Sequence, residues 1–267
     1  MTLHRFAVCL ACAVVLLIAA GGLVKSKEAG LSVPDWPTSY GGLNPPRWWT
    51  IDTVRAEHGH RLIAGTVGLL TLGLALWAQR AEPRRWVRRL AWLAFAAVVA
   101  QALLGGLTVR LFLPPAVSIA HAALAQAFLC LVVALAVVTS GRWRAGERNS
   151  GGEDGGLRRL AAVTTGLVFL QVLVGAVMRH TGAGLAIPTF PDVFGGVVPS
   201  SWSFGVGVHY AHRVGALLVS FGVIWTAGRV FARHRASRAL IVPALSTLVA
   251  LAVQVTLGAF VVLTQKA

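Results

Sequence analysis

The chain has 267 residues, of which 56% are hydrophobic and only 12% are charged. Soluble domains have about 25% charged residues, so this composition excludes an ordinary soluble globular protein. A net charge of +15 is large enough for nucleic-acid binding, but the basic residues are concentrated in particular links between apolar runs, which excludes that class.

Seven long apolar runs follow one another along the chain, and each approaches or exceeds the roughly 20 residues that a helix needs to cross a bilayer. They cover residues 6–24, 60–78, 90–109, 116–138, 160–178, 206–228 and 239–263. The sequence therefore predicts an all-α, polytopic membrane helical bundle in contact with lipid. The first run is longer than the apolar part of a usual signal peptide, so we interpret it as a membrane helix.

Arginines crowd every second link between these runs. The residues concerned are Arg80, Arg84, Arg85, Arg88, Arg89, Arg142, Arg144, Arg148, Arg158, Arg159, Arg229, Arg233, Arg235 and Arg238. Because basic residues favour the cytoplasmic side, these links and the N-terminus are predicted to be cytoplasmic, in an inner (plasma) membrane. Within the first run, Cys9 and Cys12 have the spacing of a redox motif but no polar neighbours, so they are predicted to be small packing residues.

Three stretches of the chain recur at nearly one offset. "GLSVPDWPTSYGG" (30–42) matches "GLAIPTFPDVFGG" (184–196), "EHGHR" (57–61) matches "HYAHR" (209–213), and "QALLGG" (101–106) matches "QVTLGA" (254–259). Such a repeat indicates a duplicated unit, and a unit with an even number of helices gives parallel repeats. We therefore predict two tandem parallel four-helix repeats.

The repeat also predicts the domain boundaries. The N-terminal half covers residues 1–140, the Gly-rich and charged stretch 141–159 is a flexible cytoplasmic linker, and the C-terminal half covers residues 160–267. The counterpart of His121 would fall beyond the last residue, so we expect seven helices, with the eighth helix and its histidine missing. Two long loops, 25–59 and 179–205, should face outward, where their aromatic residues serve as interface anchors, as parts of a lid, or as both.

Histidines near the outer ends of the helices are the main candidates for chemistry. His60 opens the second helix, His121 lies about two turns into the fourth, and His212 is the counterpart of His60. Two imidazoles that face each other from neighbouring helices are suited to binding a haem iron axially. The surrounding residues are small and either leave room for a macrocycle or simply allow close helix packing: Gly59, Gly65, Gly68, Ala120, Ala122, Ala123 and Ala125.

Charged residues accompany two of these histidines. Glu57 precedes His60 by three residues, so both share a helical face, and a carboxylate there can act as a general base. The matching residue in the second half is His209, so only the first half would be catalytic. Arg61 and Arg213 either pair with haem propionates or extend to lipid headgroups.

Together, the motifs "GLSVPDWPTSYGGLNPP", "EHGHRLIAGTVGLL", "QALLGGLTV", "AHAALAQ" and "HYAHRVGA" resemble the haem A synthase family over nearly the whole chain. The resemblance implies two four-helix halves and oxidation of the haem o C8 methyl group to a formyl group, giving haem a for cytochrome oxidase. It implies that His60 and His121 lie at the substrate haem site with Glu57 as the catalytic carboxylate. It also implies a haem b cofactor held by a second pair of histidines. Only His212 of that pair is present, so the resemblance implies impaired activity.

The resemblance further implies partners: the enzyme that produces haem o, an electron acceptor that the sequence does not identify, and cytochrome oxidase assembly factors. Many relatives carry a cysteine pair in the first outer loop, and this chain has no cysteine in either long loop.

A non-catalytic b-type cytochrome that receives electrons from quinol remains an alternative, because it would need the same histidines but not Glu57. A transporter would show interrupted helices, and the prenyltransferase that makes haem o would show clustered carboxylates. Neither pattern is found here.

Overall fold

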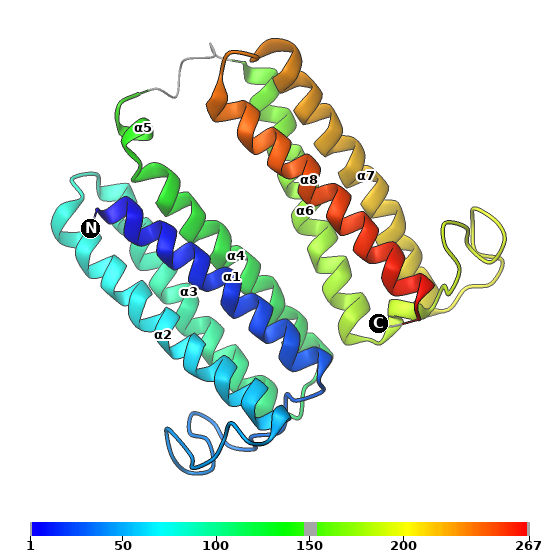
Figure 1. Ribbon diagram of the computed structural model, residues 1–267, viewed down its shortest axis with the longest axis horizontal. Helices are drawn as coiled ribbons and strands as arrows, with labels where there is room; N and C mark the ends of the chain where they lie inside the picture. The colour runs from blue at the N-terminus through cyan, green and yellow to red at the C-terminus, as the bar shows by residue number, and fades with distance from the viewer. Residues whose placement is uncertain (1, 147–153, 266–267) are drawn as a thin grey trace. The chain divides into compact units, whose positions relative to one another are not determined.

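The computed structural model describes residues 2–146 and 154–265, and these form two compact units, residues 1–147 and 148–267 (Figure 1). Seven helices in the described parts are long and apolar enough to cross a membrane. The prediction of an all-α, polytopic membrane bundle with seven membrane helices is confirmed.

Four long helices form the first unit. They are α1 (Leu3–Ser26), α2 (Asp52–Ala81), α3 (Arg85–Arg110) and α4 (Pro115–Val138), and the short α5 (Gly141–Arg144) follows them. Each long helix packs on the next and α4 packs on α1, so the four form a closed ring (Figure 1). The α1–α2 loop and the short α3–α4 turn lie at the same end of this ring, which we call the loop end.

Three long helices form the second unit. They are α6 (Gly155–His180), α7 (Phe204–Arg233) and α8 (Arg238–Leu263), with a 3₁₀ turn, η2 (Ala183–Leu185), after α6. By the sequence repeat these three helices correspond to α1, α2 and α3. Both α6 and α8 pack on α7, but in the described residues they make no extensive contact with each other, so the second unit is not a closed ring.

All seven membrane helices begin before their apolar runs, and α2 does so by the most residues. Helix α2 starts at Asp52 rather than at residue 60, because its polar first turns pack under the loop instead of in lipid. Helix α6 starts at Gly155 rather than at residue 160, because the Asp154 side chain caps it by accepting from the Leu157 amide (3.0 Å). The boundary between the two units falls inside the predicted linker, whose residues 147–153, including Arg148, lie outside the described part.

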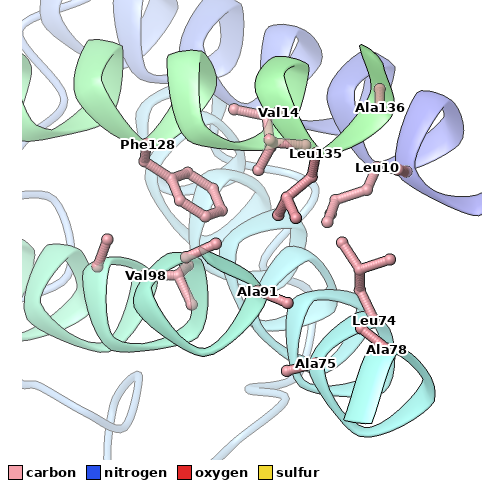
Figure 2. Close-up of a cluster of buried hydrophobic side chains, with 14 of the residues drawn as sticks. Leu10, Val14, Leu74, Ala75, Ala78, Ala91, Val98, Phe128, Leu135 and Ala136 are labelled. Carbon is pink, nitrogen blue, oxygen red and sulfur yellow. The ribbon is translucent and has the colours of Figure 1, made fainter. Parts of the chain in front are cut away.

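The apolar core of the first unit lies in the half away from the loop end. Figure 2 shows side chains from all four helices meeting there: Leu10, Val14, Leu74, Ala75, Ala78, Ala91, Val98, Phe128, Leu135 and Ala136. No residue of α1 after Val14 is buried, and none of α4 between Ser118 and Phe128. The same interruption occurs in α2 between His58 and Val67 and in α3 between Val98 and Gly106. The continuous core therefore ends before the level of His60 and His121.

The two long loops share one turn. An isolated antiparallel bridge joins Ser39 to Gly42 in the first loop and Val193 to Gly196 in the second. The glycine at the turn has a positive φ in both, 77° at Gly41 and 82° at Gly195, a conformation that favours glycine. The sequence repeat is thus a structural repeat as well.

One prediction for the first helix is wrong. Cys9 and Cys12 are free and exposed on α1 rather than packed between helices. The buried face of this helix is instead formed by Leu3, Ala7, Leu10 and Val14. Helical spacing puts the two cysteines on the other side of the helix from this stripe.

Candidate functional site

His60 and His121 lie in the loop half of the first unit, on α2 and α4, where the apolar core has ended. The His60 ring lies against α1 and the His121 ring against α3. The fold therefore places the two side chains that the sequence analysis paired in the same half of one bundle, on helices that are not neighbours in the chain. Their role as iron ligands stays a prediction.

Each of the three candidate histidines lies against a glycine of an adjacent helix. A Cβ atom on Gly21 of α1 would be 3.1 Å from Cε1 of His60, and one on Gly105 of α3 would be 3.0 Å from Cε1 of His121. In the second unit, a Cβ on Gly175 of α6 would be 3.1 Å from Cε1 of His212. These contacts are tighter than nearly all real Cβ contacts, so only glycine leaves the rings where they are.

Sequence reasoning missed these three glycines. It looked for small residues on the histidine helices themselves, whereas the contacts come from neighbouring helices. The signal was present, because Gly21 and Gly175 are related by the repeat offset, and Gly105 lies within the repeated "QALLGG" motif. Gly258, the counterpart of Gly105, has no other residue within 4 Å of its Cβ position.

The ring atoms of His60 fit an external ligand. Its Nδ1 atom is buried and has no hydrogen-bond partner in the described residues, which is rare for a buried polar atom unless a ligand or water completes the site. A cavity of about 190 Å³ reaches His60 between α1 and α2, with Lys27 and Arg55 at its rim. No three His, Cys, Asp or Glu side chains converge anywhere in residues 2–146 and 154–265.

Two glutamines fix the helices that carry the histidines. The Gln101 amide nitrogen on α3 donates to the His121 carbonyl (2.9 Å), and the Gln171 amide nitrogen on α6 donates to the His212 carbonyl (2.8 Å). The Gln171 nitrogen also lies 3.1 Å from Nδ1 of His212. Such contacts to a ligating imidazole orient its ring.

Glu57 and Arg61 on α2 bind the backbone of the first long loop. Glu57 is buried, and its two carboxylate oxygens accept from the Val33 amide (2.8 Å) and from Arg61 (2.5 Å). The Arg61 guanidinium also donates to three loop carbonyl groups, those of Val33 (2.9 Å), Asp35 (2.6 Å) and Thr38 (2.8 Å). The Arg61 N–H groups, expected to pair with haem propionates or to extend to lipid headgroups, are thus directed to loop carbonyls.

The second unit repeats this arrangement with a different acceptor. His209 takes the place of Glu57: its Nδ1 lies 3.2 Å from the Ile187 amide and its Nε2 lies 3.2 Å from Nε of Arg213, and an imidazole with one N–H can accept at only one of these two nitrogens. Arg213 donates to three loop carbonyl groups, those of Ile187 (3.0 Å), Thr189 (2.7 Å) and Asp192 (2.9 Å). An imidazole therefore fills the structural position that the carboxylate fills in the first unit.

An aromatic pair lies beside each of these anchors. His58 is 2% exposed, its Nδ1 lies 2.8 Å from the Ser39 hydroxyl, and its ring meets Trp48 edge to face at 4.9 Å. The counterparts in the second unit, Tyr210 and Trp202, meet edge to face at 5.6 Å. His58 is therefore part of the loop packing, although the sequence placed it only at the outer margin.

These features define the class of the protein: it is a polytopic helical membrane protein with a duplicated bundle, and histidines near the loop end lie against glycines of adjacent helices. Comparison with known proteins identifies the family. Residues 50–267 match COX15-CtaA, described as cytochrome oxidase assembly protein, and the chain belongs to this family.

Several curated relatives carry one name. A protein named Heme A synthase from Symbiobacterium thermophilum is 32% identical, over 85% of this chain and 76% of its own length. Proteins of the same name from Shouchella clausii and Alkalihalophilus pseudofirmus are 30% and 28% identical, over 99% and 95% of this chain and 88% and 85% of their own lengths. The resemblance seen in the motifs is therefore confirmed at the level of the family.

Proposed function

We propose that this protein is an oxidoreductase of haem a synthesis that oxidises the C8 methyl group of haem o to a formyl group. The observation that carries the proposal is the pair His60 and His121, which lie on α2 and α4 at the level where the apolar core has ended. Each ring lies against a glycine, which fixes the orientation of the imidazole. A flat substrate would therefore bind between oriented imidazoles and not against a packed apolar core. Family membership and the names of the relatives support the reaction.

In this proposal the first unit binds the substrate haem and the second unit binds the haem cofactor. His60 and His121 would hold the substrate haem, and His212, oriented by Gln171, would hold a haem b cofactor. When bound, haem b supplies one-electron transfer. The fit of His212 rests on the glycine contact with Gly175, which is the same as that of His60 with Gly21.

Glu57 is the proposed catalytic carboxylate. With water as the oxygen source, converting a methyl to a formyl carbon releases four protons and four electrons, so the reaction needs a proton acceptor and an electron acceptor. Glu57 lies on the same helix face as His60, and its carboxylate can take up protons if Arg61 and the Val33 amide release one of its oxygens.

The decisive experiment is to express the chain with a source of haem o and to identify the haems extracted from the purified protein. Haem a should form, and His60→Ala or His121→Ala should abolish it together with the spectrum of the bound substrate haem. His4→Ala is the matched control, because His4 lies at the opposite end of the first unit against the Ala136 carbonyl (2.8 Å). Bound haem o that is never converted would contradict the proposal.

A non-catalytic b-type cytochrome is the second candidate, and one observation favours it. Since His209 occupies the same position between the loop backbone and the neighbouring arginine as Glu57, the carboxylate can be explained by loop anchoring alone. Glu57→Gln distinguishes the two candidates. Loss of haem a formation with intact haem binding supports the enzyme, and an unchanged yield supports the cytochrome.

We further propose a plasma-membrane location with a cytoplasmic N-terminus and the haem sites near the outer face. The arginine-rich links at the ends opposite the loops support this orientation. The proposed partners are the haem o-producing enzyme, an electron acceptor and cytochrome oxidase assembly factors. Labelling with an impermeant thiol reagent tests the orientation. In a chain without its native cysteines, Val197→Cys should react from outside and Arg142→Cys should not.

A further inference from the structure

Trp36 of the first long loop lies in a notch on α3. A Cβ atom on Gly106 would be only 2.4 Å from Cδ2 of the Trp36 indole, so no residue with a side chain fits there while the indole keeps its place. The preceding residue, Gly105, receives the His121 ring. Adjacent glycines on one helix thus hold the loop tryptophan and a candidate iron ligand.

The loop is fixed on both sides of Trp36. Arg61 binds the carbonyl groups of Asp35 and Thr38, which flank the tryptophan, and Glu57 binds the amide of Val33. The helix that provides these anchors, α2, also carries His60. The loop therefore connects α2, which carries His60, to α3, against which the His121 ring lies.

The second unit has the same anchors without the notch. Phe190 and Ala259 take the places of Trp36 and Gly106. Phe190 lies 5.8 Å from the Arg213 guanidinium and is 38% exposed. The insertion of an indole into α3 is therefore particular to the first unit, the one proposed to hold the substrate.

We propose that Trp36 is a positioning residue for the substrate haem site, held in the Gly106 notch by Arg61 and Glu57. It closes the loop end of the first bundle and keeps α3 at the distance that sets the orientation of the His121 ring on Gly105. Arg61 is accordingly the anchor of this closure, and its counterpart Arg213 anchors a loop that does not close in the same way. The identity of the haem rests on the proposed function, whereas the seating of Trp36 does not.

Gly106→Ala tests the proposal without changing the tryptophan, its anchors or the histidines. The added methyl group should displace Trp36, so that amides in residues 30–42 of the full-length protein exchange hydrogen faster. The spectrum of the substrate haem should change, and the yield of haem a should fall by about tenfold to a hundredfold, as expected for misplaced groups at a reaction site. Gly22→Ala is the matched control, because nothing lies within 4 Å of its Cβ position near the loop end of α1.

A second variant separates positioning from a general loss of stability. Combining Gly106→Ala with Trp36→Phe installs the pair of residues found in the second unit, and the smaller ring should restore much of the protection and of the haem spectrum. Unchanged exchange in Gly106→Ala, or no recovery in the double variant, would overturn the proposal. If the wild-type protein binds haem but makes no haem a, the proposed function is wrong. Amide hydrogen exchange in residues 30–42 and the spectrum of the bound haem still test the role of Trp36 in that case.

Discussion

The imidazole of His60 lies directly against Gly21, with Cε1 3.1 Å from the point that a Cβ atom would occupy. The same relationship joins His212 to Gly175 at the equivalent positions of the second unit. A contact that recurs in both copies of a duplicated bundle indicates that the orientation of the ring is set by the neighbouring helix.

Gly21→Ala should weaken haem binding in the first unit. The methyl group forces the His60 ring to move by a few tenths of an ångström, and changes around a ligand typically cost about tenfold to a hundredfold in affinity. Haem titration followed by absorbance measures the effect. Gly22→Ala should bind like the wild type, and equal affinities in all three proteins would contradict the assignment of His60.

Gly175→Ala should act on the second unit alone. It should lower the content of the haem held by His212, while the substrate haem of the first unit keeps its spectrum. Gly166→Ala is the control on the same helix, because its Cβ position has no other residue within 4 Å. A loss of both haems in Gly175→Ala would show that the two sites are not independent.

Asp35 orders the turn of the first loop. Its carboxylate accepts from the Thr38 hydroxyl (2.6 Å) and from the Tyr40 and Gly41 amides (2.6 and 2.9 Å). The Thr38 and Gly41 hydrogen bonds lower the Asp35 pKa to about 2, so this contribution to loop order is complete above about pH 4 and is lost as the pH falls towards 2. Asp35→Ala should therefore make this turn exchange hydrogen several-fold faster at neutral pH.

The second loop provides the control for that change. There the aspartate and threonine have exchanged places: Thr189 accepts from the Phe194 amide (3.0 Å) and Asp192 from the Gly195 amide (2.6 Å). The double variant Asp35→Thr, Thr38→Asp should thus retain most of the protection. Equal exchange in the alanine variant and the double variant would refute the role of Asp35.

Glu82 joins the α2–α3 turn to α5. Its side chain is buried and accepts from Arg84 (2.7 Å to Nε) and from Arg144 (2.8 Å). The Arg84 hydrogen bonds lower the Glu82 pKa to about 2, so the stabilisation is present above about pH 4.5 and is lost as the pH falls towards 2. Glu82→Gln should lower the free energy of unfolding by about 1–3 kcal/mol at pH 7. Thermal unfolding in detergent measures this, with exposed Glu28→Gln as a neutral control.

Much of the fold could be predicted from the sequence. Membrane helices are specified locally by continuous apolar runs, so six of the seven begin within about five residues of the expected positions. The exception, α2, continues through polar residues such as Asp52, Glu57 and His58. These residues are stabilised by the loop above them, which a hydropathy pattern cannot show.

The candidate site was predictable only in part. The repeat selected His60, His212, Arg61 and Arg213, because a residue that recurs in both halves occupies one structural position twice. The partners of those residues depend on which helices are neighbours and on how each is rotated. For this reason Arg61 was expected to pair with a propionate or to extend to a lipid headgroup, whereas it binds loop carbonyls.

By itself, the sequence determined that this chain is a duplicated membrane bundle with histidines near one end, because hydropathy and repetition are properties of the chain alone. Only the tertiary structure decided that His60, His121 and His212 each lie on a glycine of another helix and that Trp36 lies in a notch on α3. Such contacts form between segments far apart in the chain. Whether they fit depends on differences of a few tenths of an ångström in the distance between helices, and residue spacing does not encode these differences.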